Sequence, residues 1–406
     1  MTSAKATLIV IGSGIIGLAT AFQYMKQNPD NKVILLEKEP AVGKHQSGHN
    51  SGVLHSGIYY TPGSNKATMS AAGKEMMEEF LAEEEIAYDL CGKVIVAKHE
   101  SELPKLQKIL DNGQANGVEC ELIEKERLHE IEPHVNGIKA VHVPKTGIAD
   151  YPAVAWRLAE KITEMGGEVR TSVTVTGIDE RATEVTVETD AGEFQGDYAV
   201  GCAGLYSDRV AKMTSDADVK AQIVPFRGEY YQLIPEANHL CKGLIYPVPD
   251  PRFPFLGVHF TKMIEGGVDC GPNAVLALSR EGYTWGDFNA ADLWEALSYS
   301  GFRNLAFKYW RYGLGEMWRS LNKAAFVRAL QELIPAIRAN DLEPHPAGVR
   351  AQALLPSGDL VYDFEFVVSQ RVVHVVNAPS PAATVSLMIG KHVVEKLRET
   401  FEPHGV

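Results

Sequence analysis

Cysteine is scarce in this chain of 406 residues, which contains only five scattered examples. No two of them form a C-x-x-C pair, so the sequence offers neither a disulfide framework nor a metal-ligand spacing, and we expect free thiols in a reducing compartment. No apolar run approaches the roughly 20 residues that a membrane-spanning helix needs. The first apolar run begins at Thr7, which leaves little room for a signal peptide before it. We therefore predict a cytoplasmic protein without a metal site.

Positive charge is also in short supply. Lysine and arginine total 39 against 52 aspartate and glutamate residues, which gives a formal net charge of −13 at pH 7. A nucleic-acid-binding protein needs a basic face to displace counterions, so this composition argues against nucleic acid as a partner. It does not exclude a small anionic substrate, because a few local arginines override a diffuse acidic surface. The length of the chain predicts two domains.

A glycine run, GSGIIG at residues 12–17, follows the apolar, β-branched segment 7–11. That segment is typical of a strand covered on both faces, and a helix is predicted over 15–27. The first glycine allows a tight turn, the second admits a pyrophosphate close to the backbone, and the third lets the helix pack on the strand. A second predicted strand, 32–36, ends at Glu37, where a carboxylate would accept hydrogen bonds from ribose hydroxyls. The pattern predicts a dinucleotide held at a helix N-terminus.

Segments of similar character return later in the chain. We predict a helix over 151–165, a strand over 168–175, a hairpin over 185–194, a strand over 198–204 with small residues at its end, and a strand over 372–376 followed by a closing helix to about residue 400. The predicted fold class is α/β, with a Rossmann-like domain interleaved with an α+β domain that is built on a mostly antiparallel sheet. The first domain is predicted to cover residues 1–80, 144–223 and 341–406, and the second residues 81–143 and 224–340.

The glycine run, the Ala-Gly end of the segment 198–204 and the C-terminal strand, loop and helix together resemble the FAD-dependent oxidoreductases of the D-amino-acid-oxidase type. Three further stretches resemble the members of that family that oxidise L-2-hydroxyglutarate: HNSGVLHSGIYY at 49–60, FLGVHFT at 255–261 and GVRAQ at 348–352. The resemblance spans nearly the whole chain. It implies an FAD-binding domain of the glutathione-reductase type and oxidation of L-2-hydroxyglutarate to 2-oxoglutarate. Hydride would pass from C2 to flavin N5, and electrons would go on to oxygen or a membrane quinone.

The resemblance also implies roles for individual residues in binding FAD. Those expected to hold the ADP half are Gly12, Gly14, Ile15, Ile16, Gly17, Glu37 and Lys38. Those expected to line the path to the isoalloxazine ring, to contact adenine through the backbone, and to pack near the cofactor are Ser47, Asn50, Ser51 and Gly52, then Val173, then Ala203 and Gly204. Those expected to close over the ring are Ser380, Pro381, Ala382 and Thr384. Many relatives carry glycine where this chain has Ala382 or Ala383, so the contacts of this loop differ in detail.

Oxidation of a 2-hydroxy acid needs a base for the hydroxyl proton. His55 is the candidate, because an imidazole pKa near neutrality suits that task; the alternative is a structural histidine bonded to backbone. His259 either binds substrate or is a core histidine. Arg350, where relatives place a substrate-carboxylate arginine, would bind a carboxylate through its bidentate fork, unless it pairs with flavin phosphate or a surface acid. Arg227 is a weaker candidate for the same role.

Two adjacent tyrosines follow His55 in the sequence. Tyr59 and Tyr60 would point to opposite faces of a strand, so at most one faces the substrate, and we select Tyr60. The same fold also admits an amine or amino-acid oxidase that resembles glycine or sarcosine oxidase. A further alternative is a flavin-binding module without turnover, such as a tRNA-modification or assembly partner.

The segment 294–328 is rich in aromatic and basic residues, and its only acids are Glu295 and Glu316. In an otherwise acidic chain this composition resembles a helix that lies on a membrane surface. It predicts peripheral contact with the inner face of the cell membrane, or with a quinone in it. The alternative is an amphipathic helix packed on the second domain or at an oligomer contact.

Overall fold

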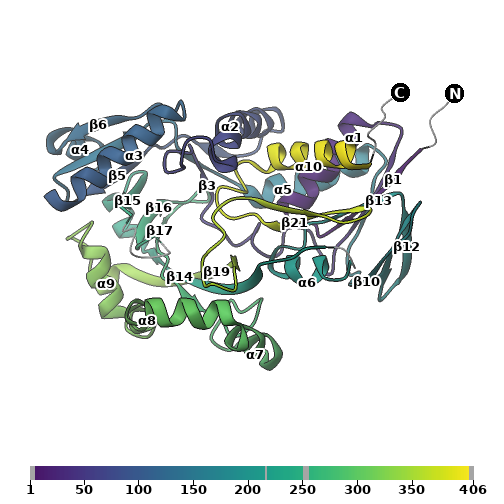
Figure 1. Cartoon of the computed structure of the whole chain (residues 1–406). Helices are drawn as coiled ribbons and strands as arrows, with labels where there is room; N and C mark the ends of the chain where they lie inside the picture. Colours follow the sequence, from purple (N-terminus) through teal and green to yellow (C-terminus); the bar gives the residue numbers. More distant parts are fainter. Residues whose placement is uncertain (1–4, 215–216, 250–255, 402–406) are drawn as a thin grey trace.

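A six-stranded sheet carries the glycine run at the edge where its parallel strands end (Figure 1). The computed structural model describes residues 5–214, 217–249 and 256–401. The strands of this sheet, in spatial order, are β20 (Glu365–Val368), β21 (Val372–Asn377), β13 (Tyr198–Gly201), β1 (Thr7–Ile11), β2 (Lys32–Leu36) and β9 (Glu168–Arg170). All neighbours are parallel except β20, which runs antiparallel to β21. The predicted Rossmann-like unit is therefore present.

Side chains of β1 alternate between two hydrophobic clusters, as expected for a strand buried on both faces. Leu8 and Val10 face a cluster built from the helices α1 (Ile15–Gln27), α2 (Asn65–Glu83), α5 (Tyr151–Glu164) and α10 (Ser386–Phe401). Ile9 and Ile11 face the opposite cluster, which includes residues of a three-stranded sheet. That sheet consists of β10 (Val175–Glu180), β11 (Val185–Thr189) and β12 (Gly192–Gly196). Two layers therefore cover the glycine-run sheet and keep water from its strands.

The strand predicted over 168–175 is shorter in the structure. β9 ends at Arg170, and β10, which pairs with β11 in the other sheet, begins at Val175. Between them Ser172 has a φ of +57°, a left-handed conformation that interrupts an extended strand. The backbone N–H of Val173 donates to the carbonyl oxygen of Glu37 at 2.8 Å, which ties this bend to the end of β2.

A nine-stranded sheet forms the second part of the molecule. Its spatial order is β18 (Val275–Leu276), β14 (Gln222–Leu233), β17 (Val268–Gly271), β16 (His259–Lys262), β15 (Leu244–Pro247), β5 (Lys93–Ala97), β7 (Lys139–Val143) and β6 (Glu121–Glu124), with β19 (Leu342–Leu354) paired to β14. Only β15 and β5 are parallel neighbours. The prediction of a mostly antiparallel sheet is therefore confirmed.

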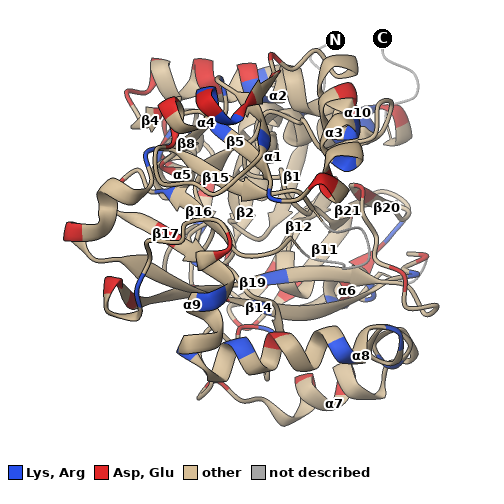
Figure 2. Ribbon diagram, turned by 90° about the vertical axis from the view of Figure 1, so that its left-hand side faces the viewer, with Lys and Arg blue, Asp and Glu red and all other residues tan. Residues whose placement is uncertain are grey.

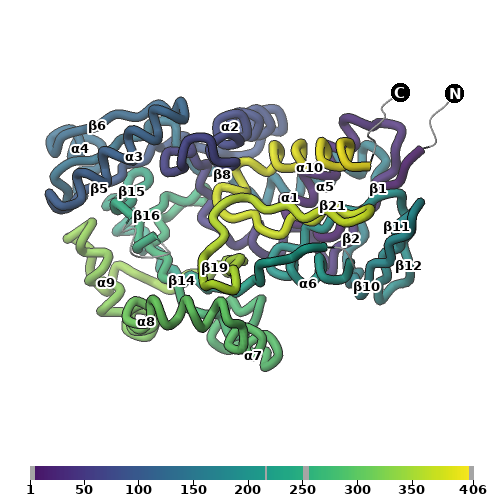
Figure 3. Tube along the Cα trace, viewed as in Figure 1, coloured from purple at the N-terminus to yellow at the C-terminus, as the bar shows by residue number. Residues whose placement is uncertain are grey.

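Strand β19 lies inside the segment 341–406 that the sequence assigned to the cofactor domain. It nevertheless pairs antiparallel with β14 along almost its whole length, from Leu342 opposite Leu233 to Leu354 opposite Gln222. A reading of separate segments misses this pairing, because more than 100 residues separate the two strands in the sequence. Figure 3 shows how the two parts interleave: the early, middle and last segments of the chain meet around the six-stranded sheet.

The remaining helices cover the nine-stranded sheet, and short strands join the parts. The helices are α3 (Leu103–Ala115), α4 (Lys125–Ile131), α7 (Ala290–Ser298), α8 (Ser300–Leu321) and α9 (Lys323–Gln331), while α6 (Ser207–Ala211) follows β13. A small third sheet consists of β3 (Val53–Leu54), β8 (Gly147–Ala149) and β4 (Tyr88–Asp89). In the described part of the chain, no helix combines the length and the apolar character that crossing a membrane requires.

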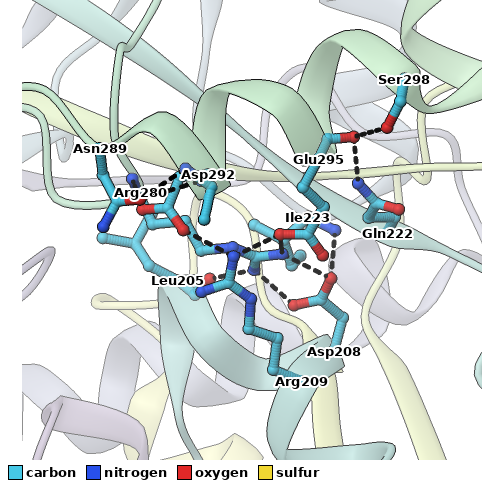
Figure 4. A network of polar contacts seen from close by, with 11 residues as sticks. Leu205, Asp208, Arg209, Gln222, Ile223, Arg280, Asn289, Asp292, Glu295 and Ser298 are labelled. Carbon is cyan, nitrogen blue, oxygen red and sulfur yellow. Dashed lines mark hydrogen bonds and ion pairs between the residues drawn. The ribbon is translucent and has the colours of Figure 1, made fainter.

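A buried ion-pair network joins α6 to α7 (Figure 4). Arg280 binds the carboxylate of Asp208 with two hydrogen bonds, of 2.5 and 3.0 Å, and donates to the carbonyl oxygen of Leu205 at 2.6 Å. Arg209 pairs with Asp292 at 2.6 Å and also with Glu295. Because bidentate arginine–carboxylate pairs are geometrically specific, the network fixes the backbone at the end of β13, where the predicted cofactor contacts lie.

Candidate active site

One cavity, about 720 Å³ in volume, lies where the C-terminal edge of the six-stranded sheet meets the nine-stranded sheet. In open α/β sheets this edge is where ligands bind. Predicted cofactor residues that line it are Gly12, Gly14, Ile15, Ile16, Glu37, Lys38, Ser47, Asn50, Ser51, Val173, Ala203, Gly204, Ser380, Pro381, Ala382 and Thr384. Gly17 and Gly52 are not among the lining residues. The structure thus brings segments from both ends of the chain to one cavity.

The three glycines of the run have different surroundings. Gly12 has a φ of +98°, and a Cβ there would lie 2.5 Å from the carbonyl oxygen of Cys202. A Cβ on Gly17 would lie 2.0 Å from the carbonyl oxygen of Gly12, so this glycine lets α1 pack against the turn. A Cβ on Gly14 would meet only the hydroxyl of Ser47, at an ordinary 3.5 Å. Packing therefore explains Gly12 and Gly17, while the space beside Gly14 is left for a ligand.

The N-terminus of α1 faces this space without a side-chain cap. Its N-cap residue is Gly14, and only the N–H of Ile15 has a side-chain acceptor, the hydroxyl of Ser47 at 2.9 Å. An uncapped helix N-terminus attracts anions through its N–H groups and its dipole. The nearby carboxylate of Glu37 accepts from the N–H and the hydroxyl of Ser13 at 2.8 and 2.7 Å. Carboxylate oxygens keep further lone pairs for ribose hydroxyls.

A cluster of ions closes the cavity beside Glu37. Lys38 pairs with Glu281 at 2.6 Å and also with Glu39, and His45 lies 3.0 Å from both carboxylates. Although burial lowers it, hydrogen bonds to Glu281 and Glu39 raise the pKa of His45 above its ordinary value. Among the described residues, Glu39, His45 and Glu281 also have the spacing of metal ligands. The ammonium of Lys38 already pairs with both carboxylates, so we interpret the cluster as a link between the two sheets.

His55 joins the loop after β3 to the C-terminal loop. The backbone N–H of His55 donates to the hydroxyl of Thr384 at 3.1 Å. In its side chain, Nε2 lies 3.1 Å from the hydroxyl of Ser380. Thr384 in turn donates to the carbonyl oxygen of Val53 at 3.2 Å. Burial, followed by the nearby charge of Lys93, holds the pKa of His55 well below 6.5. The imidazole is therefore neutral at pH 7 and has a lone pair for a proton, but its lowered pKa makes it a weaker base than the near-neutral imidazole expected from the sequence.

His259 begins β16 and also lines the cavity. Its Nδ1 lies 2.9 Å from the carbonyl oxygen of Gly257, which requires a proton on Nδ1 and leaves Nε2 as an acceptor. Its ring packs on that of Tyr246 with centroids 4.0 Å apart. Burial lowers the pKa of His259 to about 3. Phe255, the first residue of the stretch that suggested this strand, lies outside the described residues.

Arg350 on β19 lines the cavity next to Gly228 and Tyr230 of β14. A Cβ on Gly228 would lie 3.0 and 3.2 Å from the two terminal nitrogens of Arg350, so a glycine here makes room for the guanidinium. The weaker candidate Arg227 is not a lining residue. It is only 1% exposed, pairs with Glu229 at 3.0 Å and lies over the ring of Trp285.

The tyrosines of the site differ from the one we selected. Tyr59 and Tyr60 lie in a turn rather than in a strand, so the argument from alternating faces does not apply to them. Tyr60 is not among the lining residues, and its hydroxyl is bonded to Ser380. The lining tyrosines that sequence reasoning missed include Tyr230 and Tyr246. The only signal for Tyr230 in the sequence is its spacing of two from Gly228 on one strand.

Comparisons with known proteins agree with this geometry. Residues 7–396 match the model of the FAD dependent oxidoreductase family. A protein of Indibacter alkaliphilus named L-2-hydroxyglutarate dehydrogenase is 49% identical, over 97% of this chain and 99% of its own. The mitochondrial protein of that name from Nematostella vectensis is 46% identical, over 97% of this chain and 90% of its own. The structure of L-alpha-glycerophosphate oxidase from Mycoplasma pneumoniae with FAD bound is similar in fold, with a TM-score of 0.78, 21% identity, and coverage of 98% and 95%.

The residues present fit FAD. Gly14 leaves space for a pyrophosphate, α1 presents an uncapped N-terminus, and the carboxylate of Glu37 lies where a ribose is expected. The backbone N–H of Val173 is already bonded to Glu37, so only its carbonyl oxygen remains for adenine. With the family model covering nearly the whole chain, the predicted cofactor and fold are confirmed: this chain is a flavoprotein that belongs to the FAD dependent oxidoreductase family.

Proposed function

We propose that this enzyme oxidises L-2-hydroxyglutarate to 2-oxoglutarate. The observation that carries the proposal is the meeting of His55, His259 and Arg350 in the cavity lined by the cofactor residues. Oxidation of a 2-hydroxy acid needs a neutral imidazole to accept the hydroxyl proton and a guanidinium to bind the carboxylate. The cavity offers two such imidazoles and one guanidinium. The relatives that are 49% and 46% identical over nearly their whole length carry the name of this activity.

Each side chain has a distinct task in this proposal. When bound, FAD supplies the two-electron acceptor for the hydride that leaves C2. His55 takes the proton of the C2 hydroxyl, since its low pKa keeps it unprotonated at neutral pH. Arg350 holds the carboxylate beside C2, in the space that Gly228 leaves open. His259 keeps Nε2 as an acceptor, and because the hydroxyl has a single proton, His259 can only replace His55 in this task and cannot share it.

The direct test is anaerobic mixing of the holoenzyme with L- and D-2-hydroxyglutarate in separate experiments. We expect the flavin absorbance to bleach with the L isomer alone. Glycine and sarcosine serve as controls, because the fold is shared with amine oxidases. Bleaching by either amine without a response to 2-hydroxyglutarate would replace the proposed substrate. A flavin that none of the four reduces would contradict the proposal.

We also propose that α8 docks this enzyme on a membrane surface. Phe307, Trp310, Leu314, Trp318 and Leu321 are exposed, with Phe307 at 84%, and they recur at spacings of three and four on the helix. Because the backbone of α8 is non-helical at Tyr309, this spacing places Trp310, Leu314, Trp318 and Leu321 along one face of its second half, and Phe307 is exposed before the break. The half before the break packs on β14 through Phe302 and Leu305, and the half after it buries Glu316. Packing within the molecule therefore accounts for only one side of the helix.

Basic residues accompany this apolar stripe. Arg303, Lys308 and Arg311 are exposed on α8, and Figure 2 shows the basic segments along the helix. Contiguous exposed apolar surface marks an interaction site, and aromatic residues beside basic ones favour an anionic bilayer. An enzyme docked in this way has a quinone of the bilayer within reach as electron acceptor, in competition with oxygen.

Vesicle flotation tests this docking. We expect the protein to float with anionic vesicles, and less with neutral ones. A double variant, Trp310→Ser and Trp318→Ser, should remain in the dense fraction. The matched control is Trp156→Ser, since Trp156 is 62% exposed on α5, away from the stripe. No flotation at low salt would overturn the proposal, and a mass that rises with concentration would assign the stripe to a contact between copies.

A further inference from the structure

Lys93 is a buried cation that lacks an anionic partner. It lies on β5 and is 2% exposed, yet in the described part of the chain no carboxylate lies within ion-pair distance of its Nζ. The other large buried cations, Arg227 and Arg280, pair with Glu229 and Asp208. A buried charge is costly unless it is paired or hydrogen-bonded. Two aromatic rings lie near Lys93 instead. Its Nζ is 4.2 Å from the ring centroid of Tyr246 and 5.4 Å from that of Tyr59.

The second ring belongs to another buried group whose bonding is incomplete. The hydroxyl of Tyr59 is buried, and no described residue forms a hydrogen bond with it. Buried hydroxyls are rarely left in this state, so each such case calls for an explanation. The ammonium of Lys93 lacks a described carboxylate partner and the hydroxyl of Tyr59 lacks a described acceptor, so these two donors need the same kind of complement. That complement is a group with several acceptor oxygens, such as a carboxylate.

The position of this pair relates it to the cavity. The ring of Tyr246 contacts both Lys93 and His259, and Tyr246 and His259 line the cavity, whereas Lys93 and Tyr59 are not among the lining residues. The positive charge of Lys93 lowers the pKa of His55 and that of His259. The positive charge of Arg350 also lowers the pKa of His259. Two cations from different strands therefore act on the imidazole that faces the substrate.

We propose that Lys93 and Tyr59 form the subsite for the second carboxylate of a dicarboxylic substrate, with Arg350 holding the first. Because neither residue lines the cavity, the subsite requires Lys93 to move: its flexible four-carbon stem would carry the ammonium past the Tyr246 ring to the carboxylate. The tyrosine hydroxyl donates a second hydrogen bond to it. The subsite explains how the enzyme distinguishes a dicarboxylate from a 2-hydroxy acid with an apolar tail. This inference rests on the proposed function and adds its specificity.

Substrates that differ only at the far carbon test the subsite. L-2-Hydroxyvalerate has a methyl group where L-2-hydroxyglutarate has its second carboxylate. We expect Lys93→Met to lower kcat/KM for the glutarate about 10- to 100-fold, the usual range for a hydrogen bond to a charged group, and to leave the valerate within about threefold. Tyr59→Phe should lower the glutarate value by about 2- to 10-fold. Equal losses on both substrates would overturn the assignment.

A matched control separates the subsite from a general effect of positive charge. Lys66 also acts electrostatically on His55, but it lies over Tyr60 and near the carboxylate of Asp363. Lys66→Met should change the glutarate-to-valerate ratio by less than about threefold. If this variant lowers the ratio as much as Lys93→Met does, nearby charge rather than a specific contact selects the substrate, and the proposal fails.

Binding measurements on the oxidised holoenzyme keep this test independent of turnover. Glutarate and pentanoate have no hydroxyl group at C2, so the enzyme cannot oxidise them in the proposed way. The binding of each is followed by titration, through the change that it causes in the flavin spectrum. We expect tighter binding of glutarate in the wild type, and loss of that preference in Lys93→Met and Tyr59→Phe. A wild type that prefers glutarate but is not bleached by L-2-hydroxyglutarate would refute the proposed reaction alone. A wild type without the preference would refute the subsite. Should Lys93→Met not retain FAD, Tyr59→Phe decides the question.

Discussion

Replacing Gly17 by alanine places a methyl group 2.0 Å from the carbonyl oxygen of Gly12 and 3.1 Å from its carbonyl carbon. These are backbone atoms of a tight turn, so no side-chain rotation relieves the contact. Either α1 must move away from β1 or the turn must open. Gly14→Ala is the matched control, since its methyl group meets only the hydroxyl of Ser47 at 3.5 Å.

The two substitutions differ in the quantity that they change. Overpacking typically costs about 1–3 kcal/mol, and for Gly17→Ala we expect the upper end, about 3 kcal/mol, because the clash involves backbone on both sides. Gly14 has φ −65° and ψ 166°, which alanine adopts without strain. We therefore expect the stability of the apoprotein to change by less than about 1 kcal/mol in Gly14→Ala. Its affinity for FAD should fall at least about tenfold, because the methyl group occupies the approach of the pyrophosphate.

Urea unfolding of the apoproteins gives the free energies, and titration with FAD followed by flavin fluorescence gives the affinities. Gly17→Ala should lose both stability and affinity, and Gly14→Ala affinity alone. The reasoning would be refuted if the two apoproteins were equally destabilised. It would also be refuted if Gly14→Ala bound FAD as tightly as the wild type.

Three other predictions concern the substrate end of the cavity. His55→Ala should slow anaerobic reduction of the flavin about 10²- to 10⁴-fold with FAD content unchanged, and a rate within a few-fold of wild type would reject the assigned base. Arg350→Lys should raise KM for L-2-hydroxyglutarate more than it lowers kcat, because a point charge replaces a bidentate fork; an unchanged KM would place the carboxylate elsewhere. Burial lowers the pKa of Lys93 to about 7. The dissociation constant for glutarate should therefore be lowest below pH 7 and rise as Lys93 loses its proton above it, while that for pentanoate stays flat; parallel pH profiles would contradict this.

Much of the cofactor part could be predicted from local sequence. The apolar strand, the glycine turn and the helix over 15–27 are consecutive, and each is determined by neighbours in the chain. The closing helix and the hairpin were predicted for the same reason. The strand over 168–175 was wrong beyond Arg170, because a left-handed Ser172 turns the chain. Serine adopts that conformation too rarely for a sequence pattern to signal it.

The substrate end could be predicted only in part. His55, His259 and Arg350 were selected from the chemistry that the reaction needs and from stretches that resemble the family, and all three line the cavity. Tyr246 and Lys93 were not, since their significance depends on β15 and β5 lying side by side although about 150 residues separate them in the sequence. Nothing in either segment alone marks such a pairing. The choice of Tyr60 assumed a strand where the chain forms a turn.

The sequence by itself determined the dinucleotide turn, the alternation of buried strands and helices, and the residue types available for chemistry. These depend on interactions between residues close in the chain, where backbone sterics and hydrophobic periodicity act directly. Only the tertiary structure decided which polar groups face the cavity and which charges lack partners. Burial is a property of the packed whole: Lys93, Arg227 and Arg280 are all buried cations, but the partners that distinguish them come from distant strands and helices. That difference gives Arg280 a structural role and leaves Lys93 without a described carboxylate partner.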